Sequence, residues 1–159
     1  MRLYNIKVVL LSCMLLLLTS CSRSEVTLHD SNGHTISTAQ LQGKWVVINY
    51  WSDWCDNCVE EMKTLNQFYH DVESNPAIMM YGVNYDHLSG RALADVMHKL
   101  NIQFPVLVED PAELFHLALS DYLPMTFIID PKGRVVKRMI GPTTAQSLTS
   151  TIKQLQSLT

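Results

Sequence analysis

Two cysteines near the middle of the chain, Cys55 and Cys58, are separated by two residues and stand at the start of a stretch with helical periodicity. Unpaired backbone N–H groups and the positive end of a helix dipole favour a thiolate at the first of them. The second follows one helical turn later on the same face, close enough for the two sulfurs to bond. The spacing therefore predicts a dithiol switch in which Cys55 attacks a substrate disulfide and Cys58 resolves the mixed disulfide.

Other uses of this pair fit the sequence less well. A zinc site needs two further ligands, yet there is no second cysteine pair, and His70 and His87 are too far apart for the usual spacing. A covalently attached haem needs a histidine at position 59, which is Val59. A structural disulfide is the serious alternative, although closing a loop of about four residues contributes only about 2 kcal/mol. We therefore expect a redox-active disulfide and no metal.

Length and charge restrict the functions that the chain can have. It has 159 residues, 47% of them hydrophobic and 17% charged, which suits one domain with a substantial core. Twelve Lys and Arg against fifteen Asp and Glu give a formal charge of −3, so no basic surface is available for a nucleic-acid backbone. Nucleic-acid binding is therefore not expected.

The first twenty residues are typical of a signal peptide. They contain Arg2, Lys7 and no acidic residue, with an apolar run over 8–18. Those eleven residues would span about 16 Å as a helix, roughly half of a bilayer core, so a permanent membrane span is not expected. The tetrad that ends in Cys21 resembles the lipobox of bacterial lipoproteins, whose cysteine is acylated and becomes the first mature residue. Ordinary cleavage near the same position is the alternative.

Processing at Cys21 divides the chain into a signal peptide over 1–20, a tether over 21–25 and a domain over 26–159. Loss of the two N-terminal cations leaves ten basic and fifteen acidic residues, a formal charge of −5. Several acyl chains hold a protein durably on a membrane surface, at about 0.8 kcal/mol per buried CH₂. We therefore expect a lipid-anchored domain on the extracytoplasmic side of the cell envelope, where disulfides persist.

Strands and helices alternate through the rest of the sequence. Continuous apolar runs and turn residues predict strands, and apolar residues at helical spacing predict helices. The expected strands cover 26–28, 35–37, 45–51, 78–84, 105–108, 125–129 and 134–140, and the expected helices cover 55–75, 92–100, 111–119 and 143–158. Asn32 and Gly33 between the first two strands are typical of a hairpin turn. This order predicts a three-layer α/β sandwich with a mixed sheet.

Several motifs, taken in their order along the chain, resemble the thioredoxin superfamily, and within it the TlpA/ResA-type thiol–disulfide oxidoreductases of the bacterial cell envelope. The resemblance covers about residues 26–157, and it is supported by Gly33, segments 43–51, 54–58 and 123–130, and Gly133. It implies a thioredoxin-like sandwich with a mixed central sheet, an N-terminal hairpin and a helix–strand insertion at about 90–108.

The resemblance also implies functions for individual residues. Pro124 is expected to be a cis-proline that lies against the cysteines, and the backbone of Leu123 to pair with a bound substrate chain. Glu61, three residues after the second cysteine, is expected to be buried near the sulfurs and to relay protons. Asn49 stands where cytoplasmic thioredoxins have a buried aspartate, which favours the envelope subfamily. Trp54, next to the first cysteine, is expected to form part of a substrate-docking surface.

Because the sequence departs from the family pattern at two places, the redox potential of relatives cannot be assigned to this chain. Asp56 and Asn57 separate the cysteines without the proline common in relatives, and Lys63 replaces another frequent proline. The Asp56 carboxylate beside the reactive sulfur disfavours the thiolate by like charge, which stabilises the disulfide relative to the dithiol. This hypothesis favours a reductant.

The sequence thus predicts a protein-disulfide reductase that keeps client cysteines reduced, as relatives do in cytochrome c maturation, with apocytochrome c as a candidate client. A membrane thiol–disulfide transporter is expected to regenerate the dithiol, and no cofactor beyond the cysteine pair is expected. Three alternatives stay open. They are a disulfide oxidase or isomerase with the same cysteines, a peroxidase of the peroxiredoxin type, and a copper-binding or redox-inert lipoprotein.

Overall fold

A five-stranded sheet in the order β5-β4-β3-β6-β7 lies at the centre of the computed structural model, which describes residues 25–158, and a separate hairpin pairs β1 with β2. The strands are β1 (Thr27–His29), β2 (Thr35–Ser37), β3 (Trp45–Trp51), β4 (Ile78–Asn84), β5 (Val106–Leu107), β6 (Met125–Ile129) and β7 (Val135–Ile140). The helices are α2 (Thr38–Leu41), α3 (Asp56–Val72), α4 (Gly90–Lys99), α5 (Ala112–Phe115) and α6 (Ala145–Gln156).

The central strand β3 is covered on both faces, and all of its residues are buried. It runs parallel to β4, with Trp45 opposite Ile78 and Trp51 opposite Asn84, and antiparallel to β6. A nearly continuous apolar run is what a strand buried on both faces requires. Because β3 and β4 are parallel, both strands end on the same side of the sheet, and the segments that follow them lie close together there.

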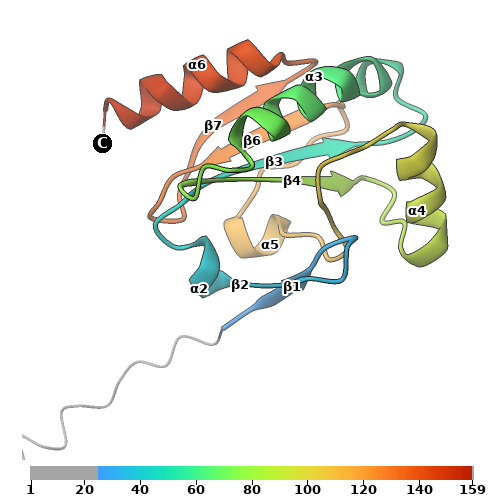
Figure 1. The fold of residues 1–159 in the computed structure, drawn as a ribbon, viewed down its shortest axis with the longest axis horizontal. Helices are drawn as coiled ribbons and strands as arrows, with labels where there is room; N and C mark the ends of the chain where they lie inside the picture. Colours follow the sequence, from blue (N-terminus) through green and yellow to red (C-terminus); the bar gives the residue numbers. More distant parts are fainter. Residues whose placement is uncertain (1–24, 159) are drawn as a thin grey trace, which may run out of the picture.

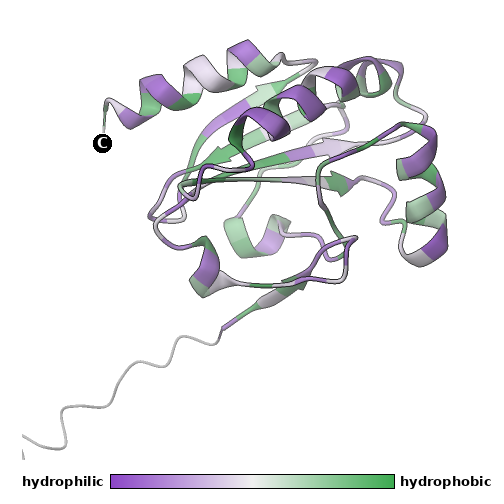
Figure 2. Ribbon diagram, in the orientation of Figure 1, coloured by the Kyte–Doolittle hydropathy of each residue, from purple (hydrophilic) through white to green (hydrophobic). Residues whose placement is uncertain are grey.

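Helices α3 and α6 cover one face of the sheet, and the hairpin, α2 and α5 lie on the other (Figure 1). The first face packs into a core cluster that includes Leu65, Phe68 and Leu148, and the second into one that includes Ile48 and Phe127. Figure 2 shows hydrophilic and hydrophobic bands alternating along the helices, as expected where one side of a helix faces the sheet. The predicted three-layer sandwich with a mixed sheet is confirmed.

Most of the predicted elements are present, and strands 35–37, 45–51, 78–84 and 125–129 have the predicted bounds. Most of the other elements are shifted by one to three residues at their ends, and two segments differ more. The short helix α2 lies where no element is predicted, although Ser37 and Gln40 form a reciprocal capping box at its start. The helix predicted over 111–119 ends at Phe115, because His116 adopts a left-handed conformation with φ of 52°.

The predicted signal peptide, the lipidation site Cys21 and all of the tether except Glu25 lie outside the described residues. These expectations therefore stay predictions. Within residues 25–158, no helix is both long enough and apolar enough to cross a membrane.

Candidate active site

A disulfide joins Cys55 and Cys58 where β3 gives way to α3, and their Cα atoms are 5.2 Å apart. Cys55 is the N-cap residue of α3, and its sulfur accepts a hydrogen bond from the backbone N–H of Cys58 at 3.2 Å. In the reduced protein, the same N–H and the helix dipole favour a thiolate at this sulfur. Cys58 is fully buried, whereas Cys55 is 8% exposed, so an incoming sulfur reaches Cys55 first.

The loop before β6 contains the predicted cis-proline. The peptide bond between Leu123 and Pro124 is cis, as the resemblance implies. The carbonyl oxygen of Pro124 accepts a hydrogen bond from the N–H of Gly141 at 2.9 Å. Leu123 is half-buried and packs against the core cluster that contains both cysteines. Because Met125 lies opposite Tyr50, the loop before it lies at the end of β3 that leads to the disulfide. The contact of Leu123 with a substrate chain stays a prediction.

Glu61 lies one turn after Cys58 on α3 and is only 3% exposed, so its predicted burial is confirmed. Its Oε1 accepts a hydrogen bond from the side-chain amide of Asn49 at 2.8 Å, and its Oε2 accepts one from the backbone N–H of Thr143 at 2.8 Å. The same amide of Asn49 donates to Thr126 Oγ1 at 3.0 Å. Three segments far apart in the sequence therefore hold this carboxyl group in place.

Burial raises the pKa of Glu61 from 4.5 to about 7, and the hydrogen bonds from Thr143 and Asn49 offset part of that rise. A carboxyl group with this pKa exchanges its proton near neutral pH. The transfer of a proton between Glu61 and the cysteines stays a prediction.

A network of hydrogen bonds beyond the C-terminal ends of β3 and β4 fixes Trp54, the neighbour of Cys55. The indole N–H of Trp54 donates to both carboxylate oxygens of Asp86 at 3.0 Å, and its ring packs edge-on against Tyr85. Asp86 also accepts a hydrogen bond from the hydroxyl of Ser52, which is fully buried. Since Trp54 is 60% exposed, the network presents a large apolar surface next to the disulfide in a fixed orientation.

No motif or local pattern in the sequence singles out Asp86, Ser52 or Thr143. The parallel pairing of β3 with β4 is the signal that points to the first two, because residues after two parallel strands meet at one edge of the sheet. No comparable signal marks Thr143. It acts through its backbone N–H, which every residue except proline possesses.

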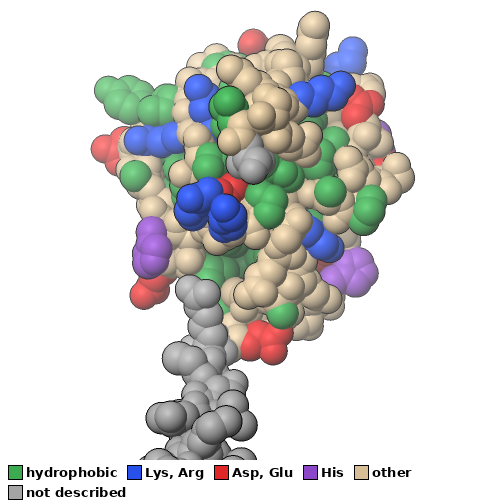
Figure 3. Space-filling model, turned by 90° about the vertical axis from the view of Figure 1, so that its left-hand side faces the viewer, with side chains coloured by type: hydrophobic (Ala, Val, Ile, Leu, Met, Phe, Trp, Pro, Cys, Tyr) green, Lys and Arg blue, Asp and Glu red, His purple; other side chains and the backbone are tan. Residues whose placement is uncertain are grey.

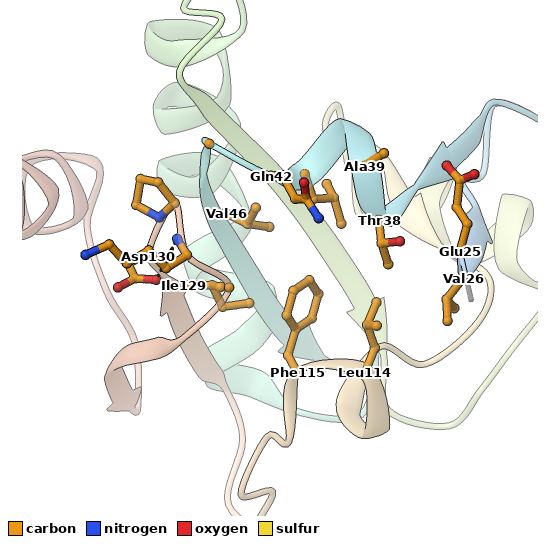
Figure 4. A pocket seen from close by; sticks show the side chains of 15 residues that line it. Glu25, Val26, Thr38, Ala39, Gln42, Val46, Leu114, Phe115, Ile129 and Asp130 are labelled. Carbon is orange, nitrogen blue, oxygen red and sulfur yellow. Dashed lines mark hydrogen bonds between the residues drawn. The ribbon is translucent and has the colours of Figure 1, made fainter. Parts of the chain in front are cut away.

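The described part of the chain has a groove apart from the disulfide, but no cluster of metal ligands. Among residues 25–158, no group of three or more His, Cys, Asp or Glu side chains is arranged to hold a metal ion. A groove of about 700 Å³ lies on the face of the sheet opposite α3, and its lining includes Val46, Phe115 and Ile129 but neither cysteine (Figure 4). The groove and the disulfide are therefore separate features.

A thioredoxin-like sandwich with a Cys-x-x-Cys disulfide at the start of a helix defines the class of thioredoxin-like thiol–disulfide oxidoreductases. The chain belongs to the AhpC/TSA family, which it matches over residues 22–138. Thiol-disulfide oxidoreductase ResA of Bacillus subtilis (strain 168) is 31% identical over 118 residues, which are 74% of this chain and 64% of ResA. The match therefore spans slightly less than two thirds of that relative's length.

Two solved structures share the fold. StoA from Bacillus subtilis superposes with a TM-score of 0.66 at 22% identity, covering 82% of this chain and 98% of StoA. The pneumococcal exposed lipoprotein thioredoxin Etrx1 from Streptococcus pneumoniae strain TIGR4 also has a TM-score of 0.66, at 19% identity, covering 82% of this chain and 99% of Etrx1. The predicted fold and family are confirmed.

Proposed function

We propose that the protein is a lipid-anchored disulfide reductase of the cell envelope that keeps the cysteines of client proteins reduced. The main support is the arrangement of Cys55, Cys58 and Glu61. It combines an accessible sulfur at a helix N-terminus with a fully buried partner sulfur and a buried carboxyl group whose pKa is about 7. An outer nucleophile, an inner resolving thiol and a proton acceptor are what disulfide reduction requires.

In the proposed reaction, the reduced protein attacks first through the Cys55 thiolate. Its sulfur bonds to one sulfur of the client disulfide, the client S–S bond breaks, and the other client sulfur leaves as a thiolate that takes a proton from water. Glu61 accepts the proton of Cys58, and the Cys58 thiolate then attacks Cys55 Sγ. The mixed disulfide breaks, and the second client sulfur leaves with the proton from Glu61. The client has gained two electrons, and the protein holds the Cys55–Cys58 disulfide.

Client binding is proposed on the surface around the disulfide. Trp54 would contact the client chain with its exposed ring, in the orientation set by Asp86. The backbone of Leu123, ahead of the cis-proline Pro124, would pair with the client on the other side of the cysteine. Client proteins with accessible disulfides are therefore the proposed substrates.

The membrane anchor is proposed at Cys21, on the basis of the lipobox-like tetrad and the apolar run before it. Etrx1, which shares the fold, is an exposed lipoprotein, and this supports the same arrangement for the chain. A membrane thiol–disulfide transporter is the proposed electron donor, and apocytochrome c is a candidate client. The reaction needs no cofactor beyond the cysteine pair, and no nucleic acid takes part.

The equilibrium reduction potential in glutathione or dithiothreitol buffers tests this proposal. We expect a reversible two-electron transition close to the value of thioredoxin, about −270 mV, which disappears in Cys55→Ser and in Cys58→Ser. A potential near that of DsbA, about −120 mV, would identify an oxidase instead. Repair of a scrambled disulfide protein would favour an isomerase, and stoichiometric copper retention that depends on both cysteines would favour a binding protein.

A further inference from the structure

The described chain starts at the end of the sandwich that is remote from the disulfide. The disulfide follows the last residue of β3, Trp51, whereas Glu25 and Val26 line the groove near the first residue, Trp45 (Figures 1 and 4). A strand of seven residues is about 23 Å long. The tether therefore enters the domain about one strand length away from the reactive sulfurs.

We call the groove and its basic rim the tether face, defined by Val26, Lys44, Leu114, Phe115, Lys132 and Arg134. Lys132 lines the groove directly, and Lys44 follows Gly43, which also lines it. The N–H of Gly43 donates to the carbonyl oxygen of Pro131 at 3.0 Å, so the turns that bear the two lysines lie together. Neither lysine forms an ion pair within residues 25–158.

The cations and the acids of the tether face are nearly balanced. Of the two acids that line the groove, Asp130 is buried and accepts a hydrogen bond from Arg134 Nε at 2.8 Å, and Glu25 is exposed. Glu113, next to Leu114 on α5, is a further exposed acid, so three cations face three acids and the tether face is close to neutral. Figure 3 looks onto this end of the molecule and shows basic side chains spread across it, one group of them beside a hollow with hydrophobic walls.

The disulfide end is strongly acidic. The exposed acids next to the site residues in the chain, or in contact with them, are Asp56, Glu60 and Asp86. Lys99 reaches this end and pairs with a further acid, Asp53, at 3.2 Å. Four acids thus oppose one cation around the disulfide. The two ends of the domain form an electrostatic dipole along β3.

We propose that the protein rests on anionic phospholipid headgroups through the tether face, so that the disulfide points away from the membrane. This inference depends on the proposed lipid anchor at Cys21, which leaves residues 21–24 between the lipid and Glu25. Four extended residues reach about 14 Å. The domain therefore stays within about two Debye lengths of the surface at physiological salt, where the length is about 8 Å.

Charge here sets the orientation of the domain, while the anchor provides the attachment. A domain with a formal charge of −5 is repelled as a whole by an anionic surface. Once anchored, the domain has lower energy with the near-neutral tether face and its two lysines, unpaired within residues 25–158, near the headgroups than with its acidic end there. The exposed side chain of Val26 and the half-buried Leu114 and Phe115 add apolar contact within the groove. Clients in the aqueous phase then meet the disulfide directly.

Lysine footprinting of the anchored full-length protein tests this orientation. The protein is placed in vesicles of phosphatidylcholine, with or without about 30% phosphatidylglycerol as the anionic lipid. A brief pulse of a water-soluble acetylating reagent then labels Lys44 and Lys132, with Lys63 and Lys99 as references in the same molecule. We expect about tenfold slower acetylation of Lys44 and Lys132 on anionic vesicles only. The protection disappears at about 1 M salt, where the Debye length is about 3 Å.

Two matched double variants give an independent readout. Lys44→Gln with Lys132→Gln removes two charges from the tether face, and Lys63→Gln with Arg91→Gln removes two charges elsewhere. On anionic vesicles, hydrogen exchange in the groove segments 38–43 and 112–116 should slow in the second variant and not in the first. Equal acetylation of the four lysines, protection of Lys99 instead, or equal behaviour of the two variants would overturn the inference.

A failure of the anchor gives a different result from a failure of the orientation. If Cys21 is not acylated, mass spectrometry of the N-terminal peptide shows no added lipid mass. Residues 25–158 contain every helix and strand described above, so a chain of residues 22–159 retains the domain. Attached to nickel-chelating lipid through an N-terminal histidine tag, this chain should show the same protection of Lys44 and Lys132. Protection with this attachment supports the orientation whatever the state of Cys21, and its absence with both attachments refutes it.

Discussion

The disulfide end and the tether face of this domain differ in how open they are. Around the disulfide, the buried carboxyl of Glu61 has two hydrogen-bond donors, and the exposed ring of Trp54 is fixed by Asp86. The tether face contains an open groove of about 700 Å³ that neither cysteine lines. Bond exchange requires atoms in fixed positions, whereas contact with mobile headgroups does not. The hydrogen bonds that hold Glu61 and Trp54 therefore lie where bonds change.

The largest effect is expected from the cysteines themselves. Cys55→Ser removes the nucleophile, so reduction of a protein disulfide such as insulin should slow on the order of 10³-fold or more. Cys58→Ser keeps the nucleophile but prevents resolution, and it should accumulate a mixed disulfide with the client, visible by mass spectrometry. Comparable insulin reduction by either variant would show that this pair is not the reactive centre.

Glu61 should make the stability of the oxidised protein depend on pH. Its pKa is 4.5 when unfolded and about 7 when folded, so between these values the unfolded chain loses the proton while the folded one keeps it. The free energy of unfolding should therefore fall by about 3 kcal/mol as the pH rises through this window, as measured by urea denaturation. Glu61→Gln should remove the decline.

Glu60 provides the matched control for this measurement, since it is the adjacent residue on α3 and is exposed. Glu60→Gln should keep the wild-type dependence of stability on pH. A decline that persists in Glu61→Gln, or disappears in Glu60→Gln, would assign the titration to another group.

Packing provides a third comparison of the two ends. A Cβ at Gly82 on β4 would lie 2.8 Å from Phe104 and 2.9 Å from the indole nitrogen of Trp51, both in closely packed surroundings. Gly82→Ala should destabilise the fold by about 1–3 kcal/mol in thermal or urea unfolding. Ala39→Leu, at an exposed position in the groove, should change stability by less than about 0.5 kcal/mol. Equal losses would mean that the groove is as tightly packed as the region behind the disulfide.

The smallest effect is expected from Asp86, which positions Trp54 and is proposed not to touch the reacting sulfurs. Asp86→Asn weakens the hydrogen bonds that orient the indole, so KM for a protein disulfide should rise about fivefold, with little change in kcat or in the reduction potential. Asp95→Asn removes a carboxylate from an exposed position on α4 and is the control. A shift in the potential with unchanged KM would mean that Asp86 acts on the cysteines and not on client binding.

The elements that frame the site are visible in the sequence because their patterns are local. Segments 45–51, 78–84 and 125–129 are apolar runs bounded by turn residues, and the strands there have the predicted bounds. The cysteine spacing and the change to helical periodicity likewise place the disulfide at the start of α3. Local sequence patterns of this kind are sufficient to predict a strand that is buried on both faces.

Long-range contacts account for what the local pattern could not show. A glutamate in an isolated helix is usually exposed, and only the family resemblance predicts that Glu61 is buried. The groups that hold it are Asn49 on β3 and Thr143, which lies 82 residues further along the chain. The groove escaped prediction for a similar reason. Its lining joins Leu114 and Phe115 to residues of segments 38–43 and 129–133, which lie far apart in the sequence.

The attachment of the hairpin to the main sheet also has a mechanical consequence. Its bonds to the sheet run to the β5 region, from the N–H of Val108 to His29 at 2.8 Å and from the N–H of Ser31 to Val106 at 2.7 Å. A pull on the N-terminus therefore loads the hairpin and then β5, an edge strand that is separated from β3 by β4. Only residues 38–44 join the hairpin to β3, so these hydrogen bonds carry part of a load that the chain would otherwise pass directly to β3. The hydrogen bonds of the hairpin would thus reduce the force on β3 and on the two cysteines that follow it.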